Sequence, residues 1–405
     1  MKKIIQRKRS RLIGIVWAFM LLIPGMLSAQ ALSGTYTIGT GGTYTTIANA
    51  VSDLSTKGVS GPVTFNIIAG TYDEQFTLDV ITGSSTTNTV TFQSQGGVAS
   101  GVQIYHTAAG TADNYVIKIN GASNLSFKNL TLSATGTSYG KVIDITAQSS
   151  NISVLNDSLT SGSGISSSTN GGLIMANNVK LSDITINNNV FYGGSYGVRF
   201  IGVYNDVSTN FSITNNRFAN LYTGIQLQYV NTATVSNNTA SVTSGYAIYL
   251  NNAGGVVRVT KNILTSNNAN GLYLTNISSG TPPTGTHGLI ANNMIHITGS
   301  QNGIYVTSST YQDIVYNTVN VTGSGTSSKA FYSTSGSNYL IEDNIFSNDA
   351  GGYAYYAGTP SAISISDFNN LYSTGNYLAY WNGNLRDLAA LQTASSKEVH
   401  SVSVY

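Results

Sequence analysis

The residues best suited to chemistry are tyrosines that recur about once every 25 residues in the second half of the chain. Each is the middle residue of an apolar-X-apolar triplet, and strand alternation puts such a residue outside a core. If the triplets stack in register, the rings form one outward line with steps of about 4.8 Å and a length of about 24 Å. A sugar chain offers apolar ring faces and hydroxyls, which suit an aromatic body with a polar tip, so the line predicts a platform for an extended glycan. The predicted carbohydrate-binding residues are Gln226, Tyr249, Tyr273, Tyr305, Tyr332, Tyr355 and Tyr380.

The tyrosine line also has a purely structural explanation. Aromatic residues that pair across neighbouring strands stabilise a sheet without contacting any ligand. Both explanations hold at once if the rings pair with one another and still contact a glycan.

Charged residues occupy the same predicted outward position in the earlier coils. The line there reads Lys118, Asp144, Ile174 and Arg199. Lys118, Asp144 and Arg199 are therefore the catalytic candidates, with Asp157 and Asp183 as acids that could lie nearby. A hydrolase needs two carboxylates about 5–10 Å apart, and a calcium-assisted lyase needs several clustered carboxylates. Asp144 has no evident partner carboxylate on its own line, so the pattern favours a binding surface over an active site.

Metal-ligating residues are scattered in this sequence. There is no cysteine, which excludes disulfides and thiolate sites. The four histidines show no metal-ligand spacing and are interpreted as solvated or loop residues: His106, His287, His296 and His400. Glu342, Asp343 and Asp349 lie beside a turn and are interpreted as a solvated edge. The sequence predicts neither a metal site nor a cofactor.

The elements that must position these residues are set by one returning phrase: apolar, any, polar, Asn, any, apolar. Its asparagine falls at Asn189, Asn216, Asn238, Asn262, Asn293, Asn317 and Asn344. A fixed phrase with a spacer of variable length predicts stacked coils whose loops vary. Asparagine tolerates the left-handed conformation of a tight turn and can hydrogen-bond from coil to coil, so these residues are predicted to be scaffold.

The asparagine phrases, the coil length and the opening Tyr44-Thr-Thr-Ile47…Ala69-Gly-Thr-Tyr72 resemble the right-handed parallel β-helix, or pectin-lyase-like, superfamily. The low charge and the Ser, Thr, Asn and Gly content resemble secreted Bacteroidetes-type repeat proteins. The resemblance implies an all-β, right-handed parallel β-helix solenoid of about eleven or more coils. It leaves the activity open, because the superfamily includes lyases, hydrolases, esterases and non-catalytic surface proteins. In its enzymes the catalytic groups lie on the equivalent outward face, where this chain has Lys118, Asp144 and Arg199.

The ends of the chain carry separate signals. Residues 1–29 have a basic start, an apolar run and small residues before Gln30, which predicts a cleaved signal peptide. Residues 30–60 are predicted to form an N-terminal cap with a short helix, 61–383 the β-helix, and 384–405 a short helix with a truncated C-terminal segment. We expect the chain to be a fragment that lacks its natural C-terminus, and a stop codon directly after Tyr405 would contradict this.

The charge balance depends on the predicted signal. Six of the 18 basic residues and none of the 16 acidic residues lie in 1–29, which leaves 12 against 16, a net charge of −4. Such a chain has nothing to hold a polyanion, so nucleic-acid binding is not expected. The predicted protein is secreted or lies on the outer cell surface, and is not embedded in a membrane after signal cleavage.

The functional prediction is a non-catalytic scaffold that contacts glycans or other surfaces through the tyrosine line. Two alternatives remain. The first is a polysaccharide lyase, glycoside hydrolase or esterase on the same fold, which predicts a cleft beside Asp144 and Arg199. The second is a structural spacer of a larger exported protein, which predicts that loops cover the tyrosines.

Overall fold

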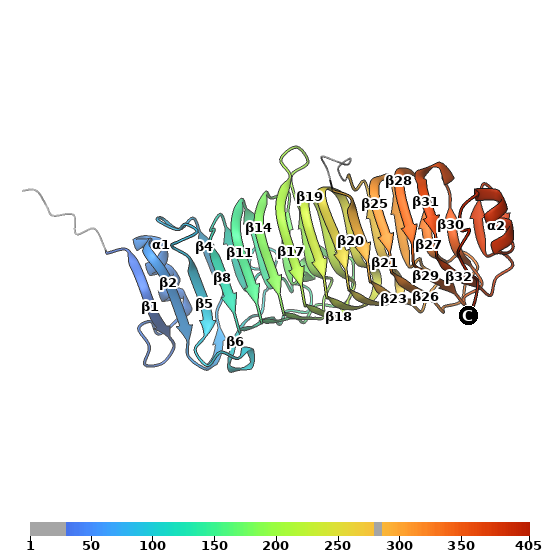
Figure 1. Cartoon of the computed structure of the whole chain (residues 1–405). Coiled ribbons are helices and arrows are strands. Elements are labelled where there is room, and N and C mark those ends of the chain that lie inside the picture. Colours follow the sequence, from blue (N-terminus) through green and yellow to red (C-terminus); the bar gives the residue numbers. More distant parts are fainter. Residues whose placement is uncertain (1–29, 279–285) are drawn as a thin grey trace, which may run out of the picture. The chain divides into compact units, whose positions relative to one another are not determined.

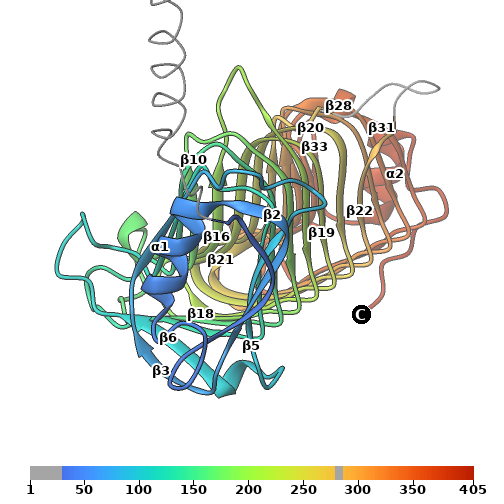
Figure 2. The same ribbon diagram turned by 90° about the vertical axis from the view of Figure 1, so that its left-hand side faces the viewer.

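A computed structural model describes residues 30–278 and 286–405. The predicted signal peptide, 1–29, lies outside the described residues. Residues Leu32–Tyr405 form one compact unit, an all-β parallel solenoid of about 13 turns with two helices, one near each terminus (Figures 1 and 2). The predicted fold class is therefore confirmed. No helix among the described residues combines the length and apolar character needed to cross a membrane.

Each regular coil contributes one strand to each of three faces, and strands of successive coils pair in parallel. The face that carries the tyrosines, called the first face, consists of β4 (Phe76–Asp79), β7 (Ile117–Asn120), β10 (Ile143–Ala147), β13 (Ile174–Asn177), β16 (Tyr196–Ile201), β24 (Ile304–Thr307), β27 (Lys329–Ser333), β30 (Tyr353–Ala357) and β33 (Ala379–Trp381), with parts of three longer strands. The longer strands are β19 (Thr223–Ser236), β20 (Thr239–Thr260) and β21 (Ile263–Thr275), which run on through the corners. A last short strand, β34 (Asn384–Leu385), pairs antiparallel with β33.

The other two faces complete the coils. The second face contains β1 (Leu32–Ile38), β2 (Val59–Ile67), β5 (Val90–Ser94), β8 (Leu125–Lys128), β11 (Ser149–Leu155), β14 (Leu181–Asn187), β17 (Ser208–Thr214), β22 (Gly288–Ala291), β25 (Ser309–Val315), β28 (Gly336–Glu342) and β31 (Ile363–Asp367). The third face contains β3 (Gly70–Asp73), β6 (Val102–His106), β9 (Thr131–Ala134), β12 (Ser158–Ser161), β15 (Val190–Tyr192), β18 (Arg217–Leu221), β23 (Met294–Ile297), β26 (Thr318–Val321), β29 (Ile345–Asn348) and β32 (Asn370–Ser373).

A helix lies near each end of the coil stack. α1 (Ile47–Lys57) begins after Thr46, whose Oγ1 accepts a hydrogen bond from the backbone N–H of Asn49, and buries Leu54 among other apolar residues. It confirms the predicted N-terminal helix. α2 (Leu388–Ser395) lies within the predicted segment 384–405 and begins after Leu385, which pairs in β34.

The repeated asparagines form a buried ladder between the second and third faces. From Asn189 onward, the backbone N–H and the Nδ2 of one asparagine both donate to the Oδ1 of the next, at 2.9–3.1 Å. Nδ2 also donates to a backbone carbonyl of the preceding coil. The ladder extends one coil beyond the predicted set, to Asn369. The scaffold role predicted for these residues is confirmed.

The left-handed turn residue is not the repeated asparagine itself. Backbone φ is positive at the residue before each one: Asn188, Asn215, Asn237, Lys261, Asn292, Tyr316, Asp343 and Phe368. The prediction placed the left-handed conformation one residue too late. The repeated asparagine is instead needed for its amide, because its side chain satisfies backbone groups that the turn buries.

Candidate functional site

Strand register places one outward side chain per coil along the first face. Residues that pair in succession are Thr77, Lys118, Asp144, Met175, Arg199, Gln226, Tyr249, Tyr273, Tyr305, Tyr332, Tyr356 and Tyr380. Six consecutive tyrosines, from Tyr249 to Tyr380, therefore do lie on one line, and we call them the tyrosine row. Two residues predicted to lie on the outward line, Tyr355 and Ile174, do not lie on it.

Tyr355 does not belong to the row. Its side chain is fully buried, with its ring centroid 5.2 Å from that of Phe331, and its hydroxyl lies 2.9 Å from Ser366 Oγ. Burial raises its pKa well above the ordinary tyrosine value. The strand places Tyr355 inside and Tyr356 outside, since Phe331 pairs with Tyr355 and Tyr332 with Tyr356.

The prediction also placed Ile174 on the outward line, whereas Met175 holds that position. Ile174 pairs with Ile143 and Val198 in the core, while Met175 pairs with Asp144 and Arg199. Met175 is only 3% exposed.

Alanine substitutions at Tyr355 and Tyr356 test this register. Tyr355→Ala is expected to lower the free energy of unfolding by about 3–5 kcal/mol, because it empties a core position. Tyr356→Ala is expected to cost about 1–2 kcal/mol, because it removes ring contacts at the surface. Urea unfolding of the two variants measures the difference, and equal losses would contradict the register.

The rings of the tyrosine row stack on one another. Centroids are 5.0, 4.7 and 4.4 Å apart along Tyr249, Tyr273, Tyr305 and Tyr332, with interplanar angles of 10–16°. Tyr356 then stands at 87° to Tyr332, at 5.2 Å, and stacks on Tyr380 at 4.4 Å. The row is thus a four-ring stack followed by a two-ring stack.

Ring stacking decides what the row presents outward. The faces of the inner rings are covered by their neighbours, whereas all six side chains remain partly exposed. A ligand therefore meets ring edges, which carry the positive part of the ring quadrupole, and hydroxyls, which both donate and accept hydrogen bonds. The face-on contact predicted for sugar rings is not offered within the four-ring stack.

Four hydroxyls of the row, those of Tyr249, Tyr273, Tyr332 and Tyr356, have raised pKa values and are neutral at physiological pH. Burial, followed by the nearby Tyr273 and Tyr246, raises the pKa of Tyr249 to about 12. Burial likewise raises the pKa values of Tyr273, Tyr332 and Tyr356, with a smaller contribution from neighbouring rings. These four phenols present groups that both donate and accept hydrogen bonds.

Lys329 lies at the break between the two stacks. Its Nζ is 4.7 Å from the centroid of Tyr332 and 5.2 Å from that of Tyr356, both cation–π distances. Burial lowers its pKa below the ordinary lysine value. Among the described residues it has no carboxylate within ion-pair distance, so its charge faces the rings.

A second set of aromatic residues flanks the row, three positions before it in the chain. Tyr246 stacks on Tyr249 at 4.8 Å, and Tyr353 lies 5.1 Å from Tyr356. Tyr377 stacks on Tyr353 at 6.4 Å. The triplet pattern missed these residues because it counts only the middle residue, although their constant spacing of three was a usable signal.

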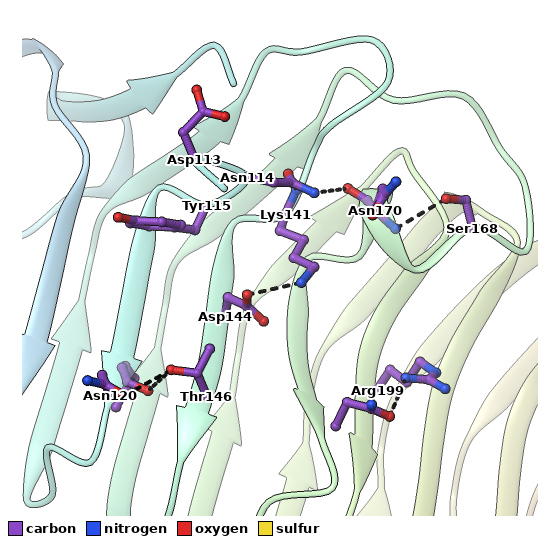
Figure 3. A network of polar contacts seen from close by, with 12 residues as sticks. Asp113, Asn114, Tyr115, Asn120, Lys141, Asp144, Thr146, Ser168, Asn170 and Arg199 are labelled. Carbon is purple, nitrogen blue, oxygen red and sulfur yellow. Dashed lines mark hydrogen bonds and ion pairs between the residues drawn. The ribbon is translucent and has the colours of Figure 1, made fainter. Parts of the chain in front are cut away.

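The catalytic candidates are not brought together. Asp144 Oδ2 pairs with Lys141 Nζ at 3.0 Å, and Arg199 lies apart from this pair (Figure 3). Strand pairing puts Arg199 two strands from Asp144, with β13 and its outward Met175 between them. Lys118 Nζ lies 4.0 Å above the ring of Tyr115.

Arg199 is held by uncharged groups. Its guanidinium carbon is 5.3 Å from the ring centroid of Tyr196, and its Nη1 donates to Asn177 Oδ1 at 3.5 Å. Burial lowers its pKa. No carboxylate of the described residues pairs with it.

Asp157 and Asp183 lie away from the tyrosine face. Asp157 occupies the first position of the buried asparagine ladder, where its Oδ1 accepts from the N–H of Leu130 at 2.7 Å and its N–H donates to Asn189 Oδ1. Burial raises its pKa to about 8. Asp183 is an exposed residue of β14 with a positive φ, and its Oδ1 accepts from Asn210 Nδ2. Neither acid can serve the catalytic candidates of the first face.

The histidines lie near single acidic or hydroxyl groups. His287 Nδ1 lies 2.7 Å from Asp313 Oδ1, and His400 Nδ1 lies 2.8 Å from Asp367 Oδ2. Across 30–278 and 286–405, no three metal-ligating side chains come together.

The sequence was compared with known proteins. A family model described as "Right handed beta helix region" matches residues 115–286 and 160–318. No curated protein matches the chain. Two solved structures of pectin methylesterase from Aspergillus niger show a likeness, each at 14% identity and a TM-score of 0.27. The deglycosylated form covers 76% of this chain and 86% of its own, and the penultimately deglycosylated form covers 79% and 87%.

Proposed function

The chain belongs to the right-handed β-helix family, and from this we propose that it is an exported, non-catalytic scaffold that contacts extended glycans through the tyrosine row. The fold repeats one side chain per coil at strand spacing, about 4.8 Å, so a run of equal residues becomes a straight strip. A strip suits a long, repetitive ligand better than a small compact one.

The observation that carries the proposal is the continuous stack from Tyr249 to Tyr332, whose side chains are partly exposed and end in hydroxyls. Glycans present dense hydroxyls, which exchange hydrogen bonds with phenols as both donors and acceptors. Because the rings brace one another, little side-chain entropy remains to be lost on binding.

The same face carries cations that a glycan with acidic or strongly accepting groups would contact. Lys118, Arg199 and Lys329 lie over aromatic rings without a carboxylate partner among the described side chains. Asp144 is the acid of the outward line and is paired with Lys141. The charge of the tyrosine face is therefore opposite to the net −4 of residues 30–405.

Export is part of the proposal. It is supported by the basic start, the apolar run and the small residues of 1–29, which have the pattern of a secretory signal. Secretion or display on the outer cell surface would bring the tyrosine row into contact with extracellular glycans.

Binding to a panel of insoluble and soluble polysaccharides tests the proposal. Wild-type protein is expected to be retained by at least one polysaccharide. Tyr273→Ala/Tyr305→Ala/Tyr332→Ala is expected to weaken that retention by about tenfold or more, since three contact residues are lost. Circular dichroism checks that the variant is folded.

The result also separates the alternatives. Release of sugar products by wild type but not by Asp144→Ala would replace the proposal with an enzyme. Absence of binding to every polysaccharide would replace it with a structural spacer.

A further inference from the structure

A second, separate site lies at the corner between the first and second faces. Strands β19 and β20 run through this corner, and β16 and β17 are linked there by a short loop that forms a bridge between Val203 and Asp206. The loop lifts Tyr204 away from the coils, so that its side chain is 70% exposed. Tyr204 is nevertheless fixed, because its ring packs edge-to-face on Tyr229 at 5.5 Å and 88°.

A depression of about 560 Å³ opens beside this tyrosine pair. Its volume lies in the range of small-molecule sites, about 300–1,000 Å³. One wall is Tyr204 and Tyr229, and the floor includes Asn252, Gly255 and Asn276. This is an aromatic wall beside an amide floor.

The floor follows from stacked turn residues. Tyr229, Asn252 and Asn276 hold equivalent corner positions in three successive coils, each with a φ of 51–54°. Parallel stacking sets such residues about 4.8 Å apart, which gives one ring followed by two amides in a line. Gly255 has a φ of 63°, and a Cβ there would come 2.2 Å from Asn231 Oδ1, so this floor position requires glycine.

The two floor amides share one acceptor. Nδ2 of Asn252 and Nδ2 of Asn276 both donate to Asn251 Oδ1, at 3.0 and 3.2 Å. Their Oδ1 atoms have no hydrogen-bond donor among the described residues. Two carbonyl oxygens therefore remain as acceptors for hydroxyl groups.

The depression is uncharged. No lysine, arginine, aspartate or glutamate lines it, and the nearby Asp206 is paired with Lys180 Nζ at 2.5 Å. A charged ligand would be desolvated there without a counter-charge, which is costly. A neutral ligand with apolar ring faces and hydroxyl donors fits both the aromatic wall and the amide floor.

We propose that this corner is a binding subsite for a short neutral oligosaccharide, with a sugar ring against the Tyr204–Tyr229 pair and its hydroxyls donating to Asn252 and Asn276. The subsite is independent of the tyrosine row, which offers edges along a flat face. It takes the end or branch of a glycan, because the depression is confined to four coils.

Titration calorimetry with cellotetraose, maltotetraose and mannotetraose tests this subsite, using residues 30–405. At least one of the three is expected to bind with a dissociation constant of about 1 mM or below. Tyr204→Ala removes the exposed wall, and Asn252→Gly removes an amide while keeping the left-handed backbone. Each is expected to weaken binding about tenfold, whereas Tyr192→Ala, an exposed tyrosine of β15, is expected to leave it unchanged.

Two outcomes would overturn the proposal: no binding of any of the three tetrasaccharides up to about 10 mM, or binding that Tyr204→Ala and Asn252→Gly leave unchanged. Loss of tetrasaccharide binding in the Tyr273→Ala/Tyr305→Ala/Tyr332→Ala variant alone would assign it to the tyrosine row instead. Polysaccharide retention that depends on the row would stand even if this subsite failed.

Discussion

Asn262→Ala is expected to lower the free energy of unfolding by about 4 kcal/mol, since two or three buried polar groups lose their partners at about 1–3 kcal/mol each. Asn262 Oδ1 accepts from both the N–H and the Nδ2 of Asn238, and its own Nδ2 donates to the carbonyl of Val235 and to Asn293 Oδ1. Alanine removes all four bonds, and no water reaches a fully buried position to replace them. Urea unfolding followed by circular dichroism measures the loss.

Asn267→Ala is the matched control. Asn267 lies five residues further along the same coil with an exposed side chain, so its substitution is expected to change stability by about 0.5 kcal/mol or less. Equal effects of the two substitutions would show that the buried ladder does not hold the coils together.

Asp157→Asn is expected to stabilise the protein by on the order of 3 kcal/mol at pH 7.5 and to remove part of its pH dependence. Asp157 holds the first position of the ladder, where the other coils have an amide. Its Oδ2 is buried and has no hydrogen-bond partner among the described residues. An asparagine Nδ2 at that position would donate as the other ladder amides do.

The direction in which stability changes with pH follows from the raised pKa of Asp157. Burial raises it from 3.8 to about 8 in the folded protein, so between these values the folded state keeps a proton that the unfolded state has lost. The contribution of Asp157 to the free energy of unfolding is fully present below about pH 4. It falls by about 1.4 kcal/mol per pH unit as the pH rises toward 8. Glu398, whose pKa burial also raises, acts in the same direction but is present in both proteins.

The difference in the free energy of unfolding between wild type and Asp157→Asn isolates the contribution of the Asp157 carboxyl group. The stability advantage of the variant is expected to grow from pH 4 to pH 8, measured by urea unfolding at each pH. Asp183→Asn makes the same charge change at an exposed residue and is expected to show no such trend. A constant difference across this range would mean that Asp157 is ionised in the folded protein.

The fold was predictable because the asparagine phrase is repeated in seven successive coils. A ladder amide can be replaced at few positions without leaving buried groups unpaired, so the phrase stays recognisable. The exact turn residue was not predictable from the phrase. Both Asn188 and Asn189 tolerate a left-handed backbone, and only the hydrogen bonds distinguish them.

The tyrosine row was predictable in outline but not in its last third. In Tyr355-Tyr356 both residues fit an outward position by type, and packing of Phe331 on Tyr355 decides which one is buried. Pairing of the rings across strands was expected as one explanation of the line, but their face-to-face orientation could not be predicted, because it depends on side-chain rotamers and not on spacing. It changes the contact surface from ring faces to ring edges.

The corner subsite could not be found from the sequence. Its wall depends on a loop of one coil leaning over the turns of later coils, and Tyr204 and Asn276 are 72 positions apart. Spacing within a strand carries no information about such a contact. The catalytic candidates failed for a simpler reason: stacking placed Met175 between Asp144 and Arg199.

Binding of the Tyr273→Phe/Tyr305→Phe/Tyr332→Phe variant, compared with wild type on the best-retained polysaccharide, tests the central claim most directly. Phenylalanine keeps the ring stack and removes only the outward hydroxyls, so the variant is expected to keep the wild-type melting temperature. Retention is expected to fall about tenfold or more, because each lost hydrogen bond contributes about 0.5–1.5 kcal/mol. Unchanged retention in the folded variant would contradict the assignment of the tyrosine hydroxyls as the glycan-contacting surface.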